Sequence, residues 1–257
     1  MRIPDLARRV AAPVRTAREE NDALRARVAD LEAEVDGMRQ ECRADLGYLF
    51  IVTYGRSGST LLQGILNAIP GYLIRGENLA MPYRLHRYHQ ASVTTRRNLA
   101  RPNRLAPTHP FFGIDDYPDD LALRDMRRLM LDTILRPEPD TRVSGFKEIR
   151  WNQKDVRGYA RFLAAVFPGA RFLINTRDHA AVSQSKWWAK KPDALAEIQD
   201  REDRLLTVLA DQGDRAFHVH YDDYVDDPGS LAALFDWLGE DFVQERVAEV
   251  LATRHSY

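Results

Sequence analysis

The stretch Tyr54-Gly55-Arg56-Ser57-Gly58-Ser59-Thr60-Leu61-Leu62 decides the fold of this 257-residue chain. It follows the apolar run 48–52, which is typical of a buried parallel strand, and it opens an amphipathic helix expected over about 59–68. A Gly/Ser-rich turn at a helix N-terminus leaves backbone N–H groups unpaired, and the helix dipole adds partial positive charge there. We therefore interpret this stretch as a phosphate-binding loop.

The side chains of the loop narrow down the kind of phosphate ligand. Arg56 supplies a full positive charge, and Ser57, Ser59 and Thr60 supply hydroxyl donors around Gly58. A Walker A loop requires G-x-x-x-x-G-K-[ST], in which the lysine contacts the terminal phosphates and the Ser/Thr binds Mg²⁺. Gly58 is followed by serine, so the lysine of a kinase or NTPase is missing. The loop has the anion cradle without the residues for a metal-bound triphosphate.

A second charged position follows a later strand pattern, 171–176. Arg177 stands where this strand ends and a helix is expected, which is where open α/β sheets bind ligands. Its guanidinium can form two hydrogen bonds to a phosphate, and a serine two turns along the next helix can reach the same group. The spacing favours Ser185 over Ser183. The alternative is an ion pair between Arg177 and Asp178 at the strand end.

Two more strand patterns end in ionisable residues. The short apolar run 72–75 leads into Gly76 and Glu77, and a strand expected near 141–146 leads into Lys147, with Glu148 and Arg150 as weaker candidates. Glu77 could instead be a solvated loop acid or a helix cap. The Lys-Glu-x-Arg string could equally be a solvated ladder on an exposed strand.

Taken together, these motifs resemble the PAPS-dependent sulfotransferases, which use 3′-phosphoadenosine 5′-phosphosulfate. The Arg-Ser-Gly-Ser-Thr loop is closest to the branch that includes bacterial carbohydrate and tyrosylprotein sulfotransferases. The resemblance covers about 48–239. It implies an α/β fold with a three-layer parallel sheet of the P-loop NTPase type. Candidate parallel strands lie near 48–54, 72–75, 141–146, 171–176 and 216–221.

The resemblance also implies a reaction and roles for these residues. PAPS would donate a sulfonate to a hydroxyl acceptor, with a carbohydrate or glycoconjugate as the first choice and no metal. The donor would be bound by Arg56, Ser57, Gly58, Ser59, Thr60, Arg177 and Ser185. Glu77 would be the general base, because an unactivated hydroxyl needs one to attack sulfur. Arg56 and Lys147 would stabilise the charge that develops on the leaving phosphate.

Composition limits the other classes of function. The net charge of −1 gives no reason to expect general nucleic-acid binding. Cys42 is the single cysteine, so disulfide frameworks and Cys₄ zinc sites are excluded. The sequence has no apolar run of membrane-spanning length and no signal-peptide pattern, and we therefore expect a cytoplasmic protein. The histidines do not form a metal-ligand pattern with acidic partners.

The N-terminal segment carries a heptad pattern. The a positions are Val14, Asn21, Val28, Val35 and Cys42, and the d positions are Ala17, Leu24, Leu31 and Met38. This pattern favours a parallel two-stranded coiled coil, in which an asparagine at an a position fixes the register. We therefore expect a homodimer formed through 14–45, an N-terminal helical segment 1–46 and a catalytic domain 47–257. The alternative is a single amphipathic helix packed on its own domain.

An arginine-rich segment and three tryptophans are further candidates for residues near the site. Six arginines and no acidic residue lie between Asn78 and Ile114, namely Arg84, Arg87, Arg96, Arg97, Arg101 and Arg104. With prolines in the same segment, this composition predicts a mobile basic flap near Glu77, which receives an anionic acceptor or covers the donor. The alternative is a solvated basic loop. Trp187 and Trp188 are expected on the helix that carries Ser185, and Trp151 is a weak candidate for acceptor binding.

Two other classes of function stay open at this point. A kinase of the same fold would use ATP and Mg²⁺, but the Walker lysine is absent. A non-catalytic adaptor would use the coiled coil for assembly and the α/β domain as a nucleotide-binding module.

Overall fold

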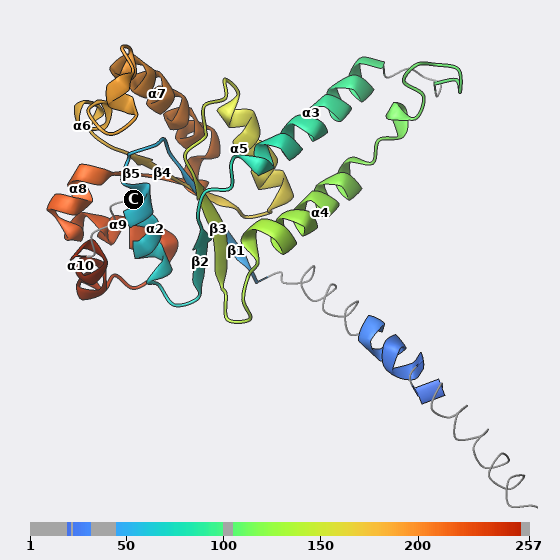
Figure 1. Ribbon diagram of the computed structural model, residues 1–257, viewed down its shortest axis with the longest axis horizontal. Coiled ribbons are helices and arrows are strands. Elements are labelled where there is room, and N and C mark those ends of the chain that lie inside the picture. The colour runs from blue at the N-terminus through green and yellow to red at the C-terminus, as the bar shows by residue number, and fades with distance from the viewer. Residues whose placement is uncertain (1–19, 22, 32–44, 100–104, 253–257) are drawn as a thin grey trace, which may run out of the picture. The chain divides into compact units, whose positions relative to one another are not determined.

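The computed structural model describes residues 20–21, 23–31, 45–99 and 105–252 (Figure 1). The chain separates into two compact units, Met1–Asp45 and Leu46–Tyr257. The described part of the first unit is helical, and the apolar side chains of Leu24, Val28 and Leu31 are exposed on it. The remaining apolar heptad positions lie outside the described residues, so the coiled-coil dimer stays a prediction.

The second unit is built on a parallel five-stranded sheet with the order β2-β3-β1-β4-β5. Its strands are β1 (Gly47–Val52), β2 (Tyr72–Arg75), β3 (Val143–Glu148), β4 (Arg171–Thr176) and β5 (Ala216–His220). The predicted α/β fold class is confirmed. The strand expected at 48–54 ends at Val52, and the strand expected at 141–146 begins and ends two residues later. Lys147 and Glu148 are therefore part of the strand rather than of the loop after it.

Helices cover both faces of this sheet. Between β1 and β4 the helices are α2 (Ser59–Asn67), α3 (Met81–Leu99), α4 (Asp119–Met130) and α5 (Val156–Val166), with the short helical segments η1 (Ile114–Asp116) and η2 (Leu131–Leu135). After β4 come α6 (His179–Ser183), η3 (Trp188–Lys190), α7 (Ala194–Gln212), η4 (Gly213–Arg215), α8 (Tyr221–Asp226), η5 (Pro228–Leu231), α9 (Ala232–Leu238) and α10 (Gln244–Ala252).

The alternation of side chains along β1 explains the two layers of helices. Phe50 and Val52 belong to one apolar core with residues of α4, α5 and α7. Leu49 and Ile51 point to the other face, into a core formed with α2, α9 and α10. Successive residues of a strand point to opposite faces, so a central strand that is apolar at every position needs cover on both.

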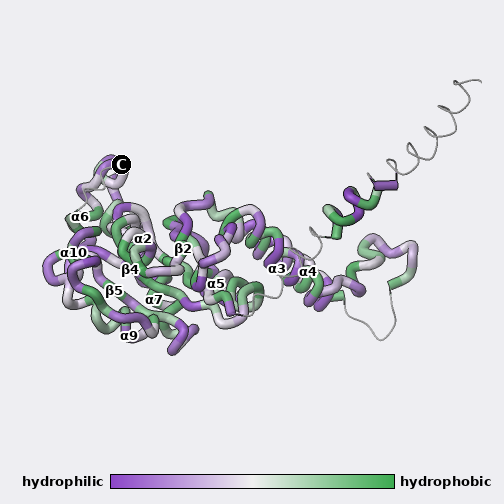
Figure 2. Tube along the Cα trace, turned by 90° about the horizontal axis from the view of Figure 1, so that it is seen from below, coloured by the Kyte–Doolittle hydropathy of each residue, from purple (hydrophilic) through white to green (hydrophobic). Residues whose placement is uncertain are grey.

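The predicted basic flap is wrong for residues 81–99, which form the 19-residue helix α3. Pro82 lies in its first turn, where the missing N–H removes no intrahelical bond. Near the other end, Arg96 forms an ion pair with Asp119 at the start of α4 and donates to the carbonyl oxygen of Tyr117. Helices α3 and α4 therefore lie side by side as a helical hairpin (Figures 1 and 2). Arg101 and Arg104 lie outside the described residues.

Parallel strands bring their carboxyl ends to one edge of the sheet. The loop 53–58 follows β1, Glu77 follows β2 and Arg177 follows β4. Lys147 is the second-last residue of β3, and Tyr221 directly follows β5. Five segments that are far apart in the sequence therefore meet at this edge. Among the described residues, no helix is both long and apolar enough to cross a bilayer.

Candidate active site

The phosphate-binding loop ends at Gly58, which precedes the first residue of α2. Gly58 has a left-handed φ of 80°, and no side chain of the described residues caps this end of the helix. A Cβ atom at this position would lie 1.9 Å from Cδ2 of Tyr221. Both the backbone conformation and the close approach of the tyrosine ring require glycine. The uncapped N-terminus is free to bind an anion.

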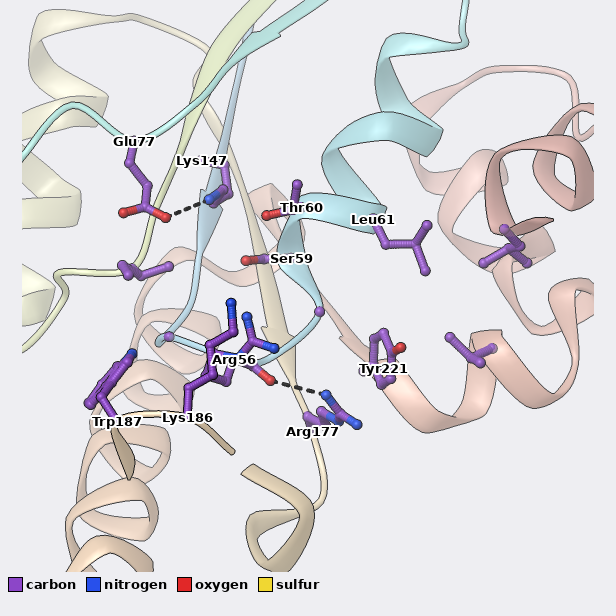
Figure 3. Close-up of a pocket in the computed structure, with 15 residues that line it drawn as sticks. Arg56, Ser59, Thr60, Leu61, Glu77, Lys147, Arg177, Lys186, Trp187 and Tyr221 are labelled. Atoms are coloured by element: carbon purple, nitrogen blue, oxygen red, sulfur yellow. Dashed lines mark hydrogen bonds and ion pairs between the residues drawn. The ribbon is translucent and has the colours of Figure 1, made fainter. Parts of the chain in front are cut away.

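The predicted loop residues do not all face the same way. Arg56, Ser59 and Thr60 line a cavity above the loop (Figure 3). The hydroxyl of Ser57 points into the protein, where its Oγ lies 2.6 Å from Oγ1 of Thr53. The carbonyl oxygen of Ser57 accepts a hydrogen bond of 2.8 Å from Nδ2 of Asn175. The side chain of Ser57 therefore holds the loop on the core, and Ser57, which is fully buried, does not line the cavity.

Arg177 lies beside this loop at the end of β4. Its Nη1 donates to the carbonyl oxygen of Arg56 at 3.3 Å, and its guanidinium lies 4.4 Å from the ring centroid of Tyr221. Its backbone N–H donates to the hydroxyl of Tyr54 at 3.0 Å, and that hydroxyl donates to Oε2 of Glu202 at 2.6 Å. Burial, and then the bond to Glu202, raises the pKa of Tyr54 well above its ordinary value, so the hydroxyl stays protonated.

Ser185 reaches the same place from a different element than expected. Helix α6 ends at Ser183, so Ser185 lies in the turn after the helix and not on it. Its Oγ accepts a hydrogen bond of 2.9 Å from Nε of Arg56. The hydroxyl of Ser183 donates to the carbonyl oxygen of Ala180 in its own helix. The structure therefore brings Ser185, and not Ser183, to the loop.

On the other side of the loop, Glu77 meets two cations. Its Oε1 accepts from Nζ of Lys147 at 2.8 Å, and its Oε2 accepts from Nη1 of Arg150 at 3.1 Å. The side chain of Lys147 is 6% exposed, whereas that of Glu77 is 33% exposed. The ends of β2 and β3 thus bring together the two residues that the sequence proposed as base and cation. Each carboxylate oxygen of Glu77 has a fixed partner.

Glu148 organises this part of the site, although the sequence indicated it only as a weak neighbour of Lys147. Its carboxylate is buried. Oε2 accepts from the backbone N–H groups of Asn78 and Ala80 at 3.2 and 2.8 Å. Oε1 accepts from the backbone N–H groups of Ile149 and Arg150 at 2.8 and 3.0 Å. One carboxylate therefore joins the loop after β2 to the end of β3.

Backbone strain marks the same loop. Leu79 and Ala80 directly follow Glu77-Asn78 and have φ values of 59° and 54°. Residues other than glycine rarely adopt this left-handed conformation, and surrounding structure must hold them in it. The hydrogen bond from Ala80 to the buried carboxylate of Glu148 supplies such a constraint. The position of Glu77 thus depends on contacts between its loop and the neighbouring strand β3.

The loop, the ends of β2 and β3 and the residues after β4 and β5 meet at one cavity of about 600 Å³. Its charged lining residues are Arg56, Lys147, Arg177, Lys186 and Glu77. Lys186 was missed by the sequence reasoning, although its place beside Ser185 was a signal. It has a left-handed φ of 45°. Four cations face a single carboxylate, so the cavity is built to bind a ligand with several negative charges.

The tryptophans differ from one another in exposure. Trp151 is buried and packs on Tyr159 with ring centroids 4.6 Å apart, so the suggested role of Trp151 in acceptor binding is wrong. Trp188 is also buried, and its Nε1 donates to the carbonyl oxygen of Gly55 at 3.0 Å. Trp187 lines the cavity and is 40% exposed. Both lie beyond the end of α6 rather than on it.

The fold and the cavity together define a class of protein. A parallel sheet with an anion-binding loop after its central strand defines a P-loop-type α/β protein, and this loop has no Walker lysine. A family model described as "Sulfotransferase family" matches residues 49–244. The chain belongs to the sulfotransferase family and is a sulfotransferase. Membership implies PAPS as the sulfonate donor. No curated protein matches the chain.

Solved sulfotransferase structures resemble this fold. The sulfotransferase domain of the olefin synthase from Synechococcus PCC 7002 is 20% identical, with a TM-score of 0.50 over 81% of this chain and 78% of that one. A sulfotransferase domain from the curacin biosynthetic pathway is 15% identical, with a TM-score of 0.49 over 81% and 78%. A sulfotransferase from Mycobacterium avium is 16% identical, with a TM-score of 0.48 over 86% and 72%. The likeness to the first of these, at 20% identity, concerns the fold alone.

The described residues contain no group of three or more His, Cys, Asp or Glu side chains that could hold a metal ion. Metal-independent transfer stays a prediction from the sequence.

Proposed function

We propose that this enzyme transfers the sulfonate of PAPS to a hydroxyl group of a carbohydrate or glycoconjugate and leaves adenosine 3′,5′-bisphosphate. The observation that carries the proposal is the meeting of Arg56, Glu77, Lys147 and Arg177 in one cavity at the N-terminus of α2 (Figure 3). A base, an anion-binding helix end and cations for two separate phosphates are the groups that this reaction needs.

Donor binding would use the loop and the end of β4. The backbone N–H groups at the start of α2, with Arg56, Ser59 and Thr60, would bind the 5′-phosphosulfate. Arg177 and Ser185 would bind the 3′-phosphate, which PAPS has and ATP lacks. The hydrogen bonds of Arg56 to Ser185 and of Arg177 to the carbonyl of Arg56 support this assignment, because they already join the two binding regions.

The transfer step would use the other side of the cavity. The acceptor hydroxyl gives its proton to the carboxylate of Glu77 while its oxygen forms a bond to sulfur. The bond between sulfur and the bridging oxygen of the 5′-phosphate breaks at the same time, and Lys147 and Arg56 stabilise the charge that this oxygen gains. The 2.8 Å contact of Lys147 with Glu77 supports the roles, since base and cation must both lie near the transferred group.

A carbohydrate is the acceptor class that we propose. The resemblance of the Arg-Ser-Gly loop to the carbohydrate branch supports it, and so does the exposed indole of Trp187 in the cavity. The heptads of 14–45 support a homodimer. The cytoplasm as the place of action is proposed from the sequence.

Calorimetry with adenosine 3′,5′-bisphosphate tests the donor site. We expect micromolar binding without metal and much weaker binding of ATP, because ATP has no 3′-phosphate for Arg177. Binding of ATP that requires Mg²⁺, with no binding of the bisphosphate, would contradict the proposal and favour a kinase. Release of the bisphosphate from PAPS in the presence of a hexopyranoside acceptor would then test transfer.

A further inference from the structure

The cavity has one wall that is aromatic and apolar. Trp187 stacks on Trp188 with ring centroids 4.2 Å apart and planes at 27°, yet 40% of Trp187 stays exposed. A Cβ atom on Gly55 would lie 2.7 Å from Cζ2 of Trp187 and 3.5 Å from Cδ1 of Ile149. The indole, the isoleucine and the glycine backbone therefore adjoin. Trp188 is itself held by the hydrogen bond from its Nε1 to the carbonyl oxygen of Gly55, and the indole of Trp187 stacks on it.

This wall lies on the side of the proposed base. Figure 3 shows Glu77, Lys147 and Trp187 on one side of the cavity, while Leu61 and Tyr221 lie on the other and the loop lies between them. Arg177 lies next to Tyr221, with its guanidinium 4.4 Å from the ring centroid. The 3′-phosphate proposed for Arg177 places the adenosine on the Tyr221 side. The Trp187 side is then the one that remains for the acceptor.

The charges of the cavity decide what kind of acceptor fits there. The 3′-phosphate carries about 1.5–2 negative charges near pH 7, and the phosphosulfate adds about two more. The cavity offers Arg56, Lys147, Arg177 and Lys186, of which Lys147 also contacts Glu77. Oδ1 of Asp222 lies 3.8 Å from Nε of Arg177 and offsets part of the positive charge there. The donor alone therefore matches the cationic charge of these lining residues. The cations beside the acceptor side are already paired, Arg150 with Glu77 and Glu148, and Lys191, which lies 5.5 Å from the ring centroid of Trp187, with Glu197.

We propose that Trp187 and Ile149 form the acceptor subsite, and that this subsite takes an uncharged sugar whose apolar ring face packs on the indole. The inference rests on the proposed function and specifies its acceptor. A ring on Trp187 presents its rim hydroxyls to the carboxylate of Glu77. A carboxylated or sulfated sugar is disfavoured, because its charge is added to that of the donor in the same cavity.

Matched sugar pairs test the charge part of the proposal. Each pair consists of a neutral 4-nitrophenyl hexopyranoside and the hexuronide with the same ring, in the gluco and galacto series. Binding is measured by calorimetry to the enzyme saturated with adenosine 3′,5′-bisphosphate. We expect the neutral member to bind roughly 10-fold or more tightly than the uronide. Equal or tighter binding of the uronides, or binding of neither member of any pair, would overturn the proposal.

Two variants test the indole. Trp187→Ala should weaken neutral sugar binding roughly 10-fold, and Trp187→Phe should keep most of it, because phenylalanine retains a flat aromatic face. Sugar binding should also change the tryptophan fluorescence of the wild type, and Trp187→Phe should lose that change. Normal sugar binding by Trp187→Ala, or a fluorescence change that persists in Trp187→Phe, would overturn the assignment.

The failure of this inference can be told apart from failure of the proposed function. Binding of the bisphosphate by the wild type and by both Trp187 variants tests the donor site independently of any sugar. If the bisphosphate binds but the sugar pairs show no preference, the acceptor assignment alone is wrong. If the bisphosphate does not bind the wild type, the proposed function is wrong.

Discussion

The two sides of the cavity are anchored in different ways. On the donor side, the loop follows the central strand β1, and buried hydrogen bonds join Ser57, Thr53 and Asn175, while Tyr224 donates to the same asparagine at 3.1 Å. On the base side, Glu77 follows the edge strand β2. Its loop contains two left-handed residues and is joined to β3 through the carboxylate of Glu148.

Donor binding and proton transfer are therefore vulnerable to different substitutions. The donor side belongs to the core, so its binding groups are held by many independent contacts. The base side depends on a few polar contacts at the edge of the sheet. Damage to donor binding and damage to proton transfer should therefore be separable by single substitutions.

Glu77→Gln should break the base side alone. The amide keeps the size of the side chain but does not accept the acceptor proton, so kcat should fall by roughly 10²–10⁴. Calorimetry should show bisphosphate affinity close to that of the wild type. Glu245→Gln, at an exposed position on α10, is the control for an amide substitution. Wild-type turnover by Glu77→Gln would remove this residue from the base role.

Arg177→Ala should break the donor side. Loss of a guanidinium that contacts a phosphate in a partly desolvated site should weaken bisphosphate binding by roughly 2–5 kcal/mol. The substitution removes the contacts of the side chain with Arg56 and Tyr221 but keeps the bond of the backbone N–H to Tyr54, so the chain should still fold. Arg215→Ala, an exposed arginine before β5, serves as the control. Unchanged bisphosphate affinity would refute the 3′-phosphate assignment.

Glu148→Gln should separate positioning from chemistry. Both carboxylate oxygens accept backbone N–H groups, so a glutamine places its NH₂ group against two donors whichever way it turns. Leaving these groups unsatisfied costs about 1–3 kcal/mol, and part of this cost should appear as displacement of the loop that carries Glu77. We expect a lower kcat with unchanged bisphosphate affinity.

The test of Glu148→Gln must distinguish displacement of the Glu77 loop from a general loss of protein stability. The kcat should fall at temperatures well below the thermal midpoint of the variant, and Glu148→Asp should recover part of it because the charge is restored. If kcat and bisphosphate affinity fall together, then Glu148 supports the whole site and not the Glu77 loop in particular.

The donor side could be predicted because each of its parts is a local sequence pattern. The loop 54–62 and the arginine after 171–176 are local patterns, and the parallel sheet then brings them together. The directions in which the side chains of the loop point could not be predicted from the sequence. Ser57 faces the core because Thr53 and Asn175 offer it partners, and the sequence pattern holds no sign of this.

The base and acceptor sides depend on contacts between distant segments. Glu148 contacts a loop some seventy residues away in sequence, which no local pattern encodes. The prolines and arginines between Asn78 and Ile114 indicated an irregular flap, yet 81–99 is a helix because His86 and Tyr83 pack against α5. Trp187 reaches the cavity because α6 ends at Ser183 and a turn follows, whereas the sequence predicted that the helix continues through Trp187.

Deleting residues 1–45 should have the smallest effect on the chemistry. Every residue assigned to the cavity lies within Leu46–Tyr257, so bisphosphate affinity and kcat should stay within about 2-fold of the full chain. Light scattering should show a change from dimer to monomer, because the apolar heptad positions lie in the deleted segment. A dimer that persists would place the interface in the catalytic domain. A truncated chain that still binds the bisphosphate but loses turnover would mean that dimerisation supports the base side, which is the side with fewer contacts to the core.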